Sequence, residues 1–248
     1  MSVDSPEQLR GLKRAGELVA QTLRVLRGAV APGVSTLELD RLAAETFARH
    51  GARSGPILTY AYPGSVCISV DEEVVHGVPG DRILRPGELV TLDVAAELGG
   101  YHADAAVTVP VGNVNAPRRR LIKATRAALA EGIRAAQPGA SLRDVGAAIE
   151  REARRRGFTV LRELTGHGIG YAMHEDPIVF NWAAPEAKTR LTPGLVFTIE
   201  PMLTAGRPRI VLERDGWTIR TADRAPSAHE EHTIMVSEAG DPLVLTVA

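Results

Sequence analysis

The sequence predicts an α+β fold made of two pseudo-symmetric halves, each with antiparallel strands covered by helices. Segments with helical periodicity are interspersed with runs in which β-branched and polar residues alternate, which is typical of strands. The same order of elements then occurs twice, at a nearly constant separation in the chain. We therefore expect residues 1–248 to form a single domain with an internal repeat of roughly 5–114 and 115–248.

Two helices are predicted at the start of the first half. Ser5 is a suitable N-cap and Gln8 completes a capping box with it, so a helix begins there and ends near Gly28. A second helix is expected from Thr36 to His50, and Gly51 ends it.

Strands are predicted to follow these helices, from about Val66 to Val78 and again from Leu89 to Val111. Two further helices are expected in the second half, from Asn115 to about Gln137 and from Ser141 to Gly157. Beyond Phe158 the composition indicates strands and loops.

Pro-Gly turns mark the internal repeat. Pro32–Gly33 leads into a helix, and Pro138–Gly139 does the same 106 residues later. A second pair of Pro-Gly turns, 107 residues apart, leads into apolar strands that contain Asp93 and Glu200. Such turns also arise by chance, but their shared order and spacing favour a duplication. Two related halves can place ligands from both on a site between them.

The composition is that of an ordinary globular protein, with 44% hydrophobic and 24% charged residues and a net charge of −1. Such a charge gives no general attraction to nucleic acid, so no specific nucleic-acid partner is expected. The single cysteine, Cys67, excludes an internal disulfide and fits a reducing compartment. Residues 1–10 do not resemble a signal peptide, and no apolar run approaches the ~20 residues of a membrane span. We expect a cytoplasmic protein without a membrane partner.

Two aspartates in the predicted strands of the first half indicate a cation. A turn centred on Leu98–Gly99 places Asp93 opposite Asp104, with Cβ atoms roughly 4.5–5.5 Å apart. Two such charges about 4 Å apart repel by about 4 kcal/mol at an effective dielectric constant near 20. A metal ion between them removes this repulsion. The alternatives are a shared proton or a shifted register that separates the pair.

The second half contains the other ligands that a metal site needs. His167 lies in a glycine-rich segment, Glu200 in an apolar strand, and Glu231 at the entrance to another strand. Together with the two aspartates these residues carry four negative charges, which two divalent cations neutralise. Many oxygens and one nitrogen favour Mn²⁺, Fe²⁺ or Co²⁺. Two such ions are suited to activating a water molecule for hydrolysis.

At these residues the sequence resembles the type I methionine aminopeptidases, members of the creatinase-like metallopeptidases with the pita-bread fold. The resemblance extends from about Glu7 to Leu245. No single motif is specific, but their order and separations are. The motifs are residues 65–70, residues 74–79, Asp93 with Asp104, residues 166–170, His174, residues 198–202 and residues 231–234.

The resemblance implies a dinuclear metal centre in a single catalytic domain. Asp93 is expected to bind one divalent ion, and His167 and Glu200 the other, with Asp104 and Glu231 bridging both. The ions are expected to be Co, Mn, Fe or Zn. The family's activity is the removal of the initiator methionine from nascent proteins and peptides, with a preference for a small second residue.

Three catalytic roles also follow from the resemblance. Glu200 is expected to act as general base, His174 to donate to the scissile carbonyl, and His76 to contact the scissile nitrogen or the adjacent backbone. The methionine side chain is expected to contact Tyr62, Cys67, Trp217, Thr59 and Met173.

Three of the positions near the methionine pocket depart from the family pattern. Thr59 and Met173 stand where aromatic residues are usual, and Tyr171 stands in place of an arginine. The shape of the pocket should therefore differ from that of the relatives. His229 and His232 flank Glu231, and a supporting role around the metal is as consistent with the sequence as a structural one.

Two rival functions fit the same fold. Xaa-Pro aminopeptidases and prolidases usually carry an additional N-terminal domain, whereas this sequence begins with the catalytic half. Proteins of this fold that bind nascent chains or ribosomes without catalysis typically lose metal ligands, and all five are present here. The basic segments 118–120 and 154–156 are most simply solvated helix surfaces, and a transient ribosome contact is the alternative. We expect a monomer that acts on nascent N-termini.

Overall fold

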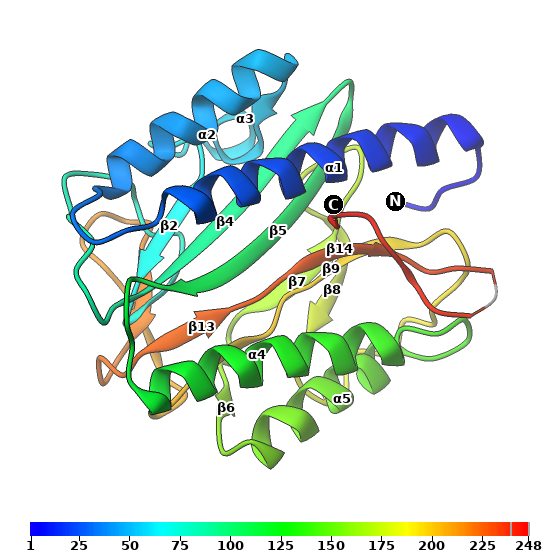
Figure 1. Ribbon diagram of the computed structural model, residues 1–248. Coiled ribbons are helices and arrows are strands. Elements are labelled where there is room, and N and C mark those ends of the chain that lie inside the picture. The colour runs from blue at the N-terminus through cyan, green and yellow to red at the C-terminus, as the bar shows by residue number, and fades with distance from the viewer. Residues whose placement is uncertain (239, 248) are drawn as a thin grey trace.

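Helices form the outer layers of the molecule, and strands lie between them. The computed structural model describes residues 1–238 and 240–247. In Figure 1, α1 (Pro6–Ala29) and α2 (Thr36–His50) cover the strands of the first half, and α4 (Ala116–Ala135) and α5 (Leu142–Arg155) cover those of the second. The predicted α+β class is confirmed. Among the described residues, no helix combines the length and apolar character needed to span a membrane.

The helix ends follow the predicted capping residues. The Ser5 hydroxyl accepts the N–H of Gln8, whose side-chain oxygen accepts the N–H of Ser5 in return. Ser35 and Ser141 begin α2 and α5 with capping boxes of the same kind. Gly51 ends α2 in the left-handed conformation, with φ of 66°, which glycine adopts without steric cost.

The first half contains a four-stranded antiparallel sheet centred on β4 (Leu89–Leu98). One edge of β4 pairs with β5 (Tyr101–Pro110), and the other pairs with β2 (Cys67–Val70) and then β1 (Arg53–Ser54). Helices α1 and α2 pack on this sheet, and their apolar residues form one buried core with it. Burying each leucine-sized side chain contributes roughly 1.5–3 kcal/mol. This core fixes the long β4–β5 hairpin that carries both aspartates.

The predicted register of this hairpin was wrong. Its two-residue turn is Gly99–Gly100, with φ of 62° and 87°, instead of the expected turn centred on Leu98–Gly99. Glycine at both positions is favoured because both φ angles are positive. Asp93 therefore lies opposite Ala106, and Asp104 is its diagonal neighbour on the same face of the sheet. The two carboxylates still meet, although they are not directly paired.

The predicted strand from 66 to 78 is broken into two. β2 ends at Val70, and β3 (Glu73–Val75) begins after Asp71, whose φ is 57°. β3 joins a separate three-stranded sheet with β12 (Ile219–Thr221) and β11 (Ile210–Leu212). The short helix α3 (Gly55–Tyr60) was not predicted, because six residues are too few to show a helical period.

The second half is built around a five-stranded sheet in the order β15–β14–β9–β7–β8. A three-stranded sheet in the order β13–β10–β6 lies next to α4 and α5. The strands are β6 (Thr159–Val160), β7 (Thr165–Gly168), β8 (Glu175–Phe180), β9 (Val196–Ile199), β10 (Met202–Thr204), β13 (Ser227–His229), β14 (His232–Met235) and β15 (Leu243–Val244).

Equivalent backbone contacts occur in the two halves. Ser35, the N-cap of α2, forms an isolated antiparallel bridge with Ile83, and Ser141, the N-cap of α5, forms the same bridge with Arg190. A two-residue strand follows each of these helices, β1 after α2 and β6 after α5. These contacts support our inference of an internal repeat, with halves at roughly 5–114 and 115–248.

The halves meet where β5 lies beside β13 and β14. The Thr233 hydroxyl donates to the carbonyl of Asp104 at 2.7 Å and accepts its N–H at 3.0 Å. The Thr108 hydroxyl makes the matching pair of contacts with the backbone of His229, both at 2.8 Å. The N–H of Glu231 donates to the β5 backbone at 2.9 Å. These bonds bring Asp104 and Glu231 together from opposite halves.

Candidate metal centre

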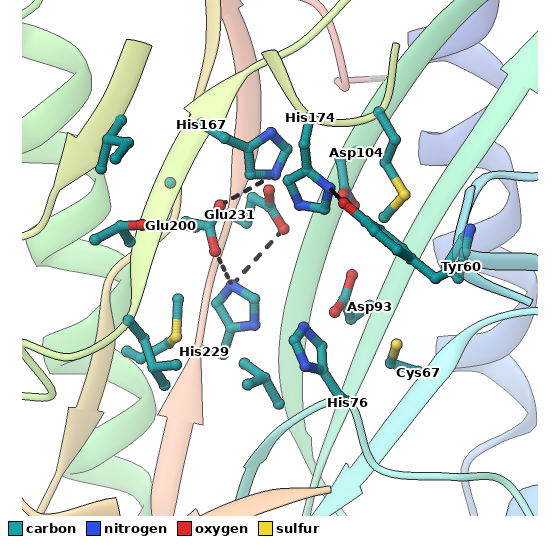
Figure 2. Close-up of a pocket in the computed structure, with 18 of the residues that line it drawn as sticks. Tyr60, Cys67, His76, Asp93, Asp104, His167, His174, Glu200, His229 and Glu231 are labelled. Atoms are coloured by element: carbon teal, nitrogen blue, oxygen red, sulfur yellow. Dashed lines mark hydrogen bonds and ion pairs between the residues drawn. The ribbon is translucent and has the colours of Figure 1, made fainter. Parts of the chain in front are cut away.

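A cavity of about 710 Å³ lies between the two halves (Figure 2). All five predicted metal ligands line it, and three of them are almost fully buried, with exposed fractions of 4%, 7% and 2% for Asp104, Glu200 and Glu231. Carboxylates that are removed from water to this extent require a positive partner or a proton. The ligands are Asp93 on β4, Asp104 on β5, His167 on β7, Glu200 after β9 and Glu231 before β14.

The donor atoms of these side chains are close enough to hold an ion. One ligand atom from each of Asp104, His167 and Glu231 lies within 4.8 Å of the others. Nε2 of His167 lies 3.5 Å from Oε1 of Glu200, which also accepts the hydroxyl of Thr198 at 2.8 Å. Figure 2 shows the five side chains turned toward a common space.

A close approach between strands β7 and β9 makes this arrangement possible. A Cβ atom on Gly166 would lie 2.7 Å from the carbonyl oxygen of Thr198 and 3.2 Å from Cγ of Glu200. The absence of a side chain at Gly166 therefore lets His167 and Glu200 come together.

The electrostatics of the cluster fit a cation. Burial raises the pKa of all four carboxyl groups, that of Asp104 to about 7. Repulsion from Asp104 raises the pKa values of Asp93 and Glu231 further. Among the described residues, Oδ1 of Asp104 and Oε1 of Glu231 have no hydrogen-bond partner. Four carboxylates, two of which have an oxygen without a hydrogen-bond partner, and one imidazole match the donor set of a divalent-metal site.

The metal-free protein is expected to lose stability as the pH rises from about 4 to 7. A carboxyl group whose pKa is raised by folding costs nothing below its unfolded pKa. It destabilises the fold progressively as the pH rises above that value, and the full cost is reached once the pH exceeds the folded pKa. This range is that of Asp104, whose folded pKa is about 7, and the raised pKa values of Asp93, Glu200 and Glu231 add to the loss of stability. Thermal unfolding of chelator-treated protein should show a falling midpoint across this range, and Asp104→Asn should reduce the fall. A midpoint independent of pH would contradict the placement of these carboxylates.

Two further histidines face the same cavity. His76 follows β3 with φ of 57°, a left-handed conformation that is uncommon outside glycine and that turns its ring toward the ligands. The His174 ring centroid is 4.0 Å from that of His167, and its Nδ1 is 2.5 Å from the hydroxyl of Tyr60. Burial lowers the pKa values of His76 and His174, so both rings are neutral near pH 7.

An apolar wall lies beside the carboxylates. Tyr62 and Trp217 meet edge to face with ring centroids 5.2 Å apart, and the Tyr62 hydroxyl donates to the carbonyl of Gly77 at 2.7 Å. Cys67 is buried and lines the cavity, and burial raises the pKa of its thiol, so it is not a thiolate nucleophile. Met173 also lines the cavity.

Thr59 and Tyr171 lie away from the cavity. Thr59 is exposed on α3, while its neighbour Tyr60 lines the cavity. Tyr171 is 56% exposed, and its hydroxyl accepts a hydrogen bond from Gln8 at 2.9 Å. Of the three departures from the family pattern, Met173 is therefore the one that contributes to the cavity wall.

The structure gives two residues a more definite place in the site than the sequence did. The contact of Tyr60 with His174 gave no signal in the sequence, because it joins residues in different halves. His229 did give one: it stands two positions before Glu231, and side chains two apart in extended chain point to the same side. Its ring lines the cavity.

Comparison with known proteins identifies the family. The model of metallopeptidase family M24 matches residues 10–238. The chain belongs to metallopeptidase family M24. Within the family, it is 39% identical to methionine aminopeptidase 1 of Bacillus subtilis, covering 98% of both chains. It is 40% identical to the methionine aminopeptidase of Escherichia coli K12, covering 97% of this chain and 92% of the relative.

Solved structures of two peptidases have the same fold. The methionine aminopeptidase of Rickettsia prowazekii superposes with a TM-score of 0.95 at 36% identity, covering all of both chains. The prolidase of Pyrococcus furiosus superposes with a TM-score of 0.81 at 20% identity, covering 99% of this chain and 65% of that one. The prolidase likeness shows the fold alone. The predicted pita-bread fold is confirmed, and as a metallopeptidase the chain is expected to use divalent metal.

Proposed function

We propose that this chain is a metal-dependent methionine aminopeptidase that removes the initiator methionine from nascent proteins and peptides. The observation that carries the proposal is the cluster of four carboxylates and one imidazole beside an apolar cavity wall. Near-full-length relatives named methionine aminopeptidase, about 40% identical, support the same activity.

The proposed centre holds two divalent ions. Asp93 is assigned to one ion and His167 with Glu200 to the other, with Asp104 and Glu231 shared between them, and Co, Mn, Fe and Zn all suit this ligand set. When bound, the ions supply an activated water nucleophile and polarise the scissile carbonyl. The unpaired oxygens of Asp104 and Glu231 support their assignment as shared ligands.

The remaining polar roles in the cavity are to accept a proton from water and to form hydrogen bonds with the substrate. Glu200 is assigned to accept the proton of the attacking water, and the hydrogen bond of 2.8 Å from Thr198 to one of its oxygens supports this assignment. His174 donates to the scissile carbonyl as negative charge develops on its oxygen. His76, whose ring faces the cavity near Asp93 in Figure 2, contacts the scissile nitrogen.

The apolar wall is the proposed methionine pocket. Tyr62, Trp217, Cys67 and Met173 offer two aromatic faces and two sulfur atoms to a thioether side chain. Sulfur–aromatic contacts contribute about 0.3–1.5 kcal/mol each. Met173, as a flexible side chain, makes this pocket more adaptable than one walled by aromatic rings.

The decisive test of the function is a set of three peptides given to metal-reconstituted protein: Met-Ala-Ser, Met-Leu-Ser and Ala-Pro. A methionine aminopeptidase releases methionine from the first and leaves Ala-Pro intact. Cleavage of Ala-Pro without cleavage of Met-Ala-Ser would identify a proline-specific enzyme. Failure to cleave any of the three by metal-loaded protein would favour a non-catalytic binding function.

The same assay tests the preference for a small second residue. His76 and the residues from Tyr60 to Pro63 crowd the space next to the scissile bond, so leucine should fit poorly after methionine. Overpacking of this kind costs about 1–3 kcal/mol. We expect kcat/KM for Met-Ala-Ser to exceed that for Met-Leu-Ser by about 5- to 150-fold. Equal values would show that this side of the cavity does not select the second residue.

Tyr60→Phe is expected to lower kcat by about 3- to 10-fold with little change in KM. An imidazole nitrogen is a stronger base than a phenol oxygen, so the Tyr60 hydroxyl donates its proton to Nδ1 of His174. The proton of the neutral ring is then on Nε2, from which it can donate to the scissile carbonyl. Loss of one such bond costs about 1 kcal/mol.

Tyr171→Phe is the matched control for Tyr60→Phe, because its hydroxyl lies outside the cavity. The nitrogen chemical shifts of His174 report its tautomer directly. A wild-type shift pattern in the Tyr60→Phe protein, together with unchanged kcat, would contradict the positioning role.

The proposal includes the setting of the enzyme. Its substrates are the N-termini of nascent polypeptides, so we expect it to act in the cytoplasm as a monomer. A transient ribosome contact would use the basic helix segments, but carboxylates within the protein already neutralise part of their positive charge. Arg118 pairs with Asp71, and Arg155 and Arg156 pair with Glu152. Arg154 lies 3.5 Å from Glu150 in turn. Arg119 and Arg120 of the first segment and all three arginines of the second are exposed.

A further inference from the structure

His229 is a buried imidazole without a hydrogen-bond partner. Its ring is 2% exposed, and neither of its nitrogens bonds to any described residue. Buried polar atoms almost always have partners, and those that lack one require an explanation. Figure 2 shows the ring inside the cavity, with one nitrogen pointing at Glu200 and Glu231.

The backbone holds this ring in place. Thr108 bonds to both the N–H and the carbonyl of His229 at 2.8 Å, and His229 pairs with Met202 in the β10–β13 ladder. The backbone at His229 is therefore fixed from both sides, and the direction of its side chain follows from the strand. A side chain held in this way is preorganised for a ligand.

The distances from the ring match ligands that share an ion better than they match hydrogen bonds. Nε2 of His229 lies 3.7 Å from Oε2 of Glu231 and 3.9 Å from Oε2 of Glu200. Both distances exceed those of N–H···O hydrogen bonds, roughly 2.7–3.2 Å. Ligand atoms that are each about 2.0–2.2 Å from one ion are roughly 3–3.6 Å from one another. Both His229 distances lie just above this range.

Glu200 stands between two imidazoles. Its Oε1 faces Nε2 of His167 at 3.5 Å, and its Oε2 faces Nε2 of His229 at 3.9 Å. We propose that His229 is a second imidazole ligand of the ion that His167 and Glu200 hold. The inference rests on the proposed metal centre and adds a sixth residue to its five ligands.

A second nitrogen changes the metal preference of the centre. Imidazole suits Co²⁺, Fe²⁺ and Zn²⁺ better than Mn²⁺, which favours oxygen ligands. His229 should therefore raise the affinity for Co²⁺ more than the affinity for Mn²⁺. This ratio distinguishes a ligand from a residue that merely fills space.

The test compares metal binding in wild-type protein, His229→Gln and His229→Ala. Glutamine keeps an N–H that can donate to the carboxylates, so it preserves a hydrogen-bonding role and removes the imidazole ligand. His232→Gln is the matched control, because His232 faces away from the cavity and bonds to Thr246 at 2.8 Å. Circular dichroism of the metal-free proteins checks that each variant folds.

We expect His229→Gln to weaken Co²⁺ binding by about 10-fold or more in calorimetric titration, with a smaller loss for Mn²⁺. Loss of a residue that only supports a ligand also costs about 10- to 100-fold, so the imidazole count decides between the two roles. X-ray absorption at one equivalent of Co²⁺ should count two imidazoles in the wild-type protein and one in the variant. His232→Gln should resemble the wild type in both measurements.

A count of one imidazole in wild-type protein, or Co²⁺ affinity unchanged in His229→Gln, would overturn the assignment. The count on wild-type protein decides the question even if the variants fail to fold. If wild-type protein binds Co²⁺ through one imidazole and still releases methionine, only the assignment of His229 is wrong and the proposed function stands. Protein that releases no methionine with Co²⁺ bound contradicts the proposed function instead.

Discussion

Chelation of the purified protein is expected to abolish methionine release, and Mn²⁺, Fe²⁺ or Co²⁺ should restore it. Asp104, Glu200 and Glu231 are buried within one cavity, and burial raises the pKa of each. Without ions these groups must take up protons or repel one another, so neither the base nor the nucleophile of the reaction is available. The loss of turnover should exceed that of any single substitution discussed here.

The measurement is methionine release before chelation, after chelation and after reconstitution, with elemental analysis at each stage. Circular dichroism controls for unfolding, because removal of the ions also destabilises the protein at neutral pH. Full turnover by protein shown to contain no metal would refute the metal-dependent mechanism.

His174→Ala should lose roughly 10²–10³ in kcat while keeping its metal, because one donor to the developing oxyanion is worth about that much. The His174 ring lines the cavity next to His167 and is held by Tyr60. Its burial lowers its pKa, so the neutral ring keeps a proton to donate near pH 7.

His167→Ala is the informative comparison for His174→Ala. His167 lies within the cluster formed with Asp104 and Glu231, so its loss should weaken metal binding itself. Calorimetric titration separates the two roles. An equal loss of metal affinity in both variants would make His174 a ligand and would contradict its assignment as a donor to the substrate.

Local chemistry made the helices and the ligand set predictable. Serine N-caps with acceptors three residues later fixed the starts of α1, α2 and α5, because these contacts lie within a single turn. Asp93 and Glu200 were conspicuous because a carboxylate is unusual inside an apolar strand.

The hairpin turn was predicted at Leu98–Gly99 and lies at Gly99–Gly100, where both positive φ angles fall on glycines. This preference is local and was readable from the sequence. Tertiary contacts decided the other features that the sequence left open. The break after Val70 follows from the pairing of β3 with β12, which is distant in sequence. The contact of Tyr60 with His174 and the exposure of Thr59 likewise depend on how α3 packs.

The number of residues removed from a protein substrate tests the central claim most directly. A purified reporter that begins with Met-Ala is incubated with the metal-reconstituted enzyme, and its intact mass is followed with time. The account predicts the loss of a single methionine and then no further change, with no loss from a reporter whose N-terminus is acetylated. An unchanged mass, or continued removal of residues beyond methionine, would contradict it.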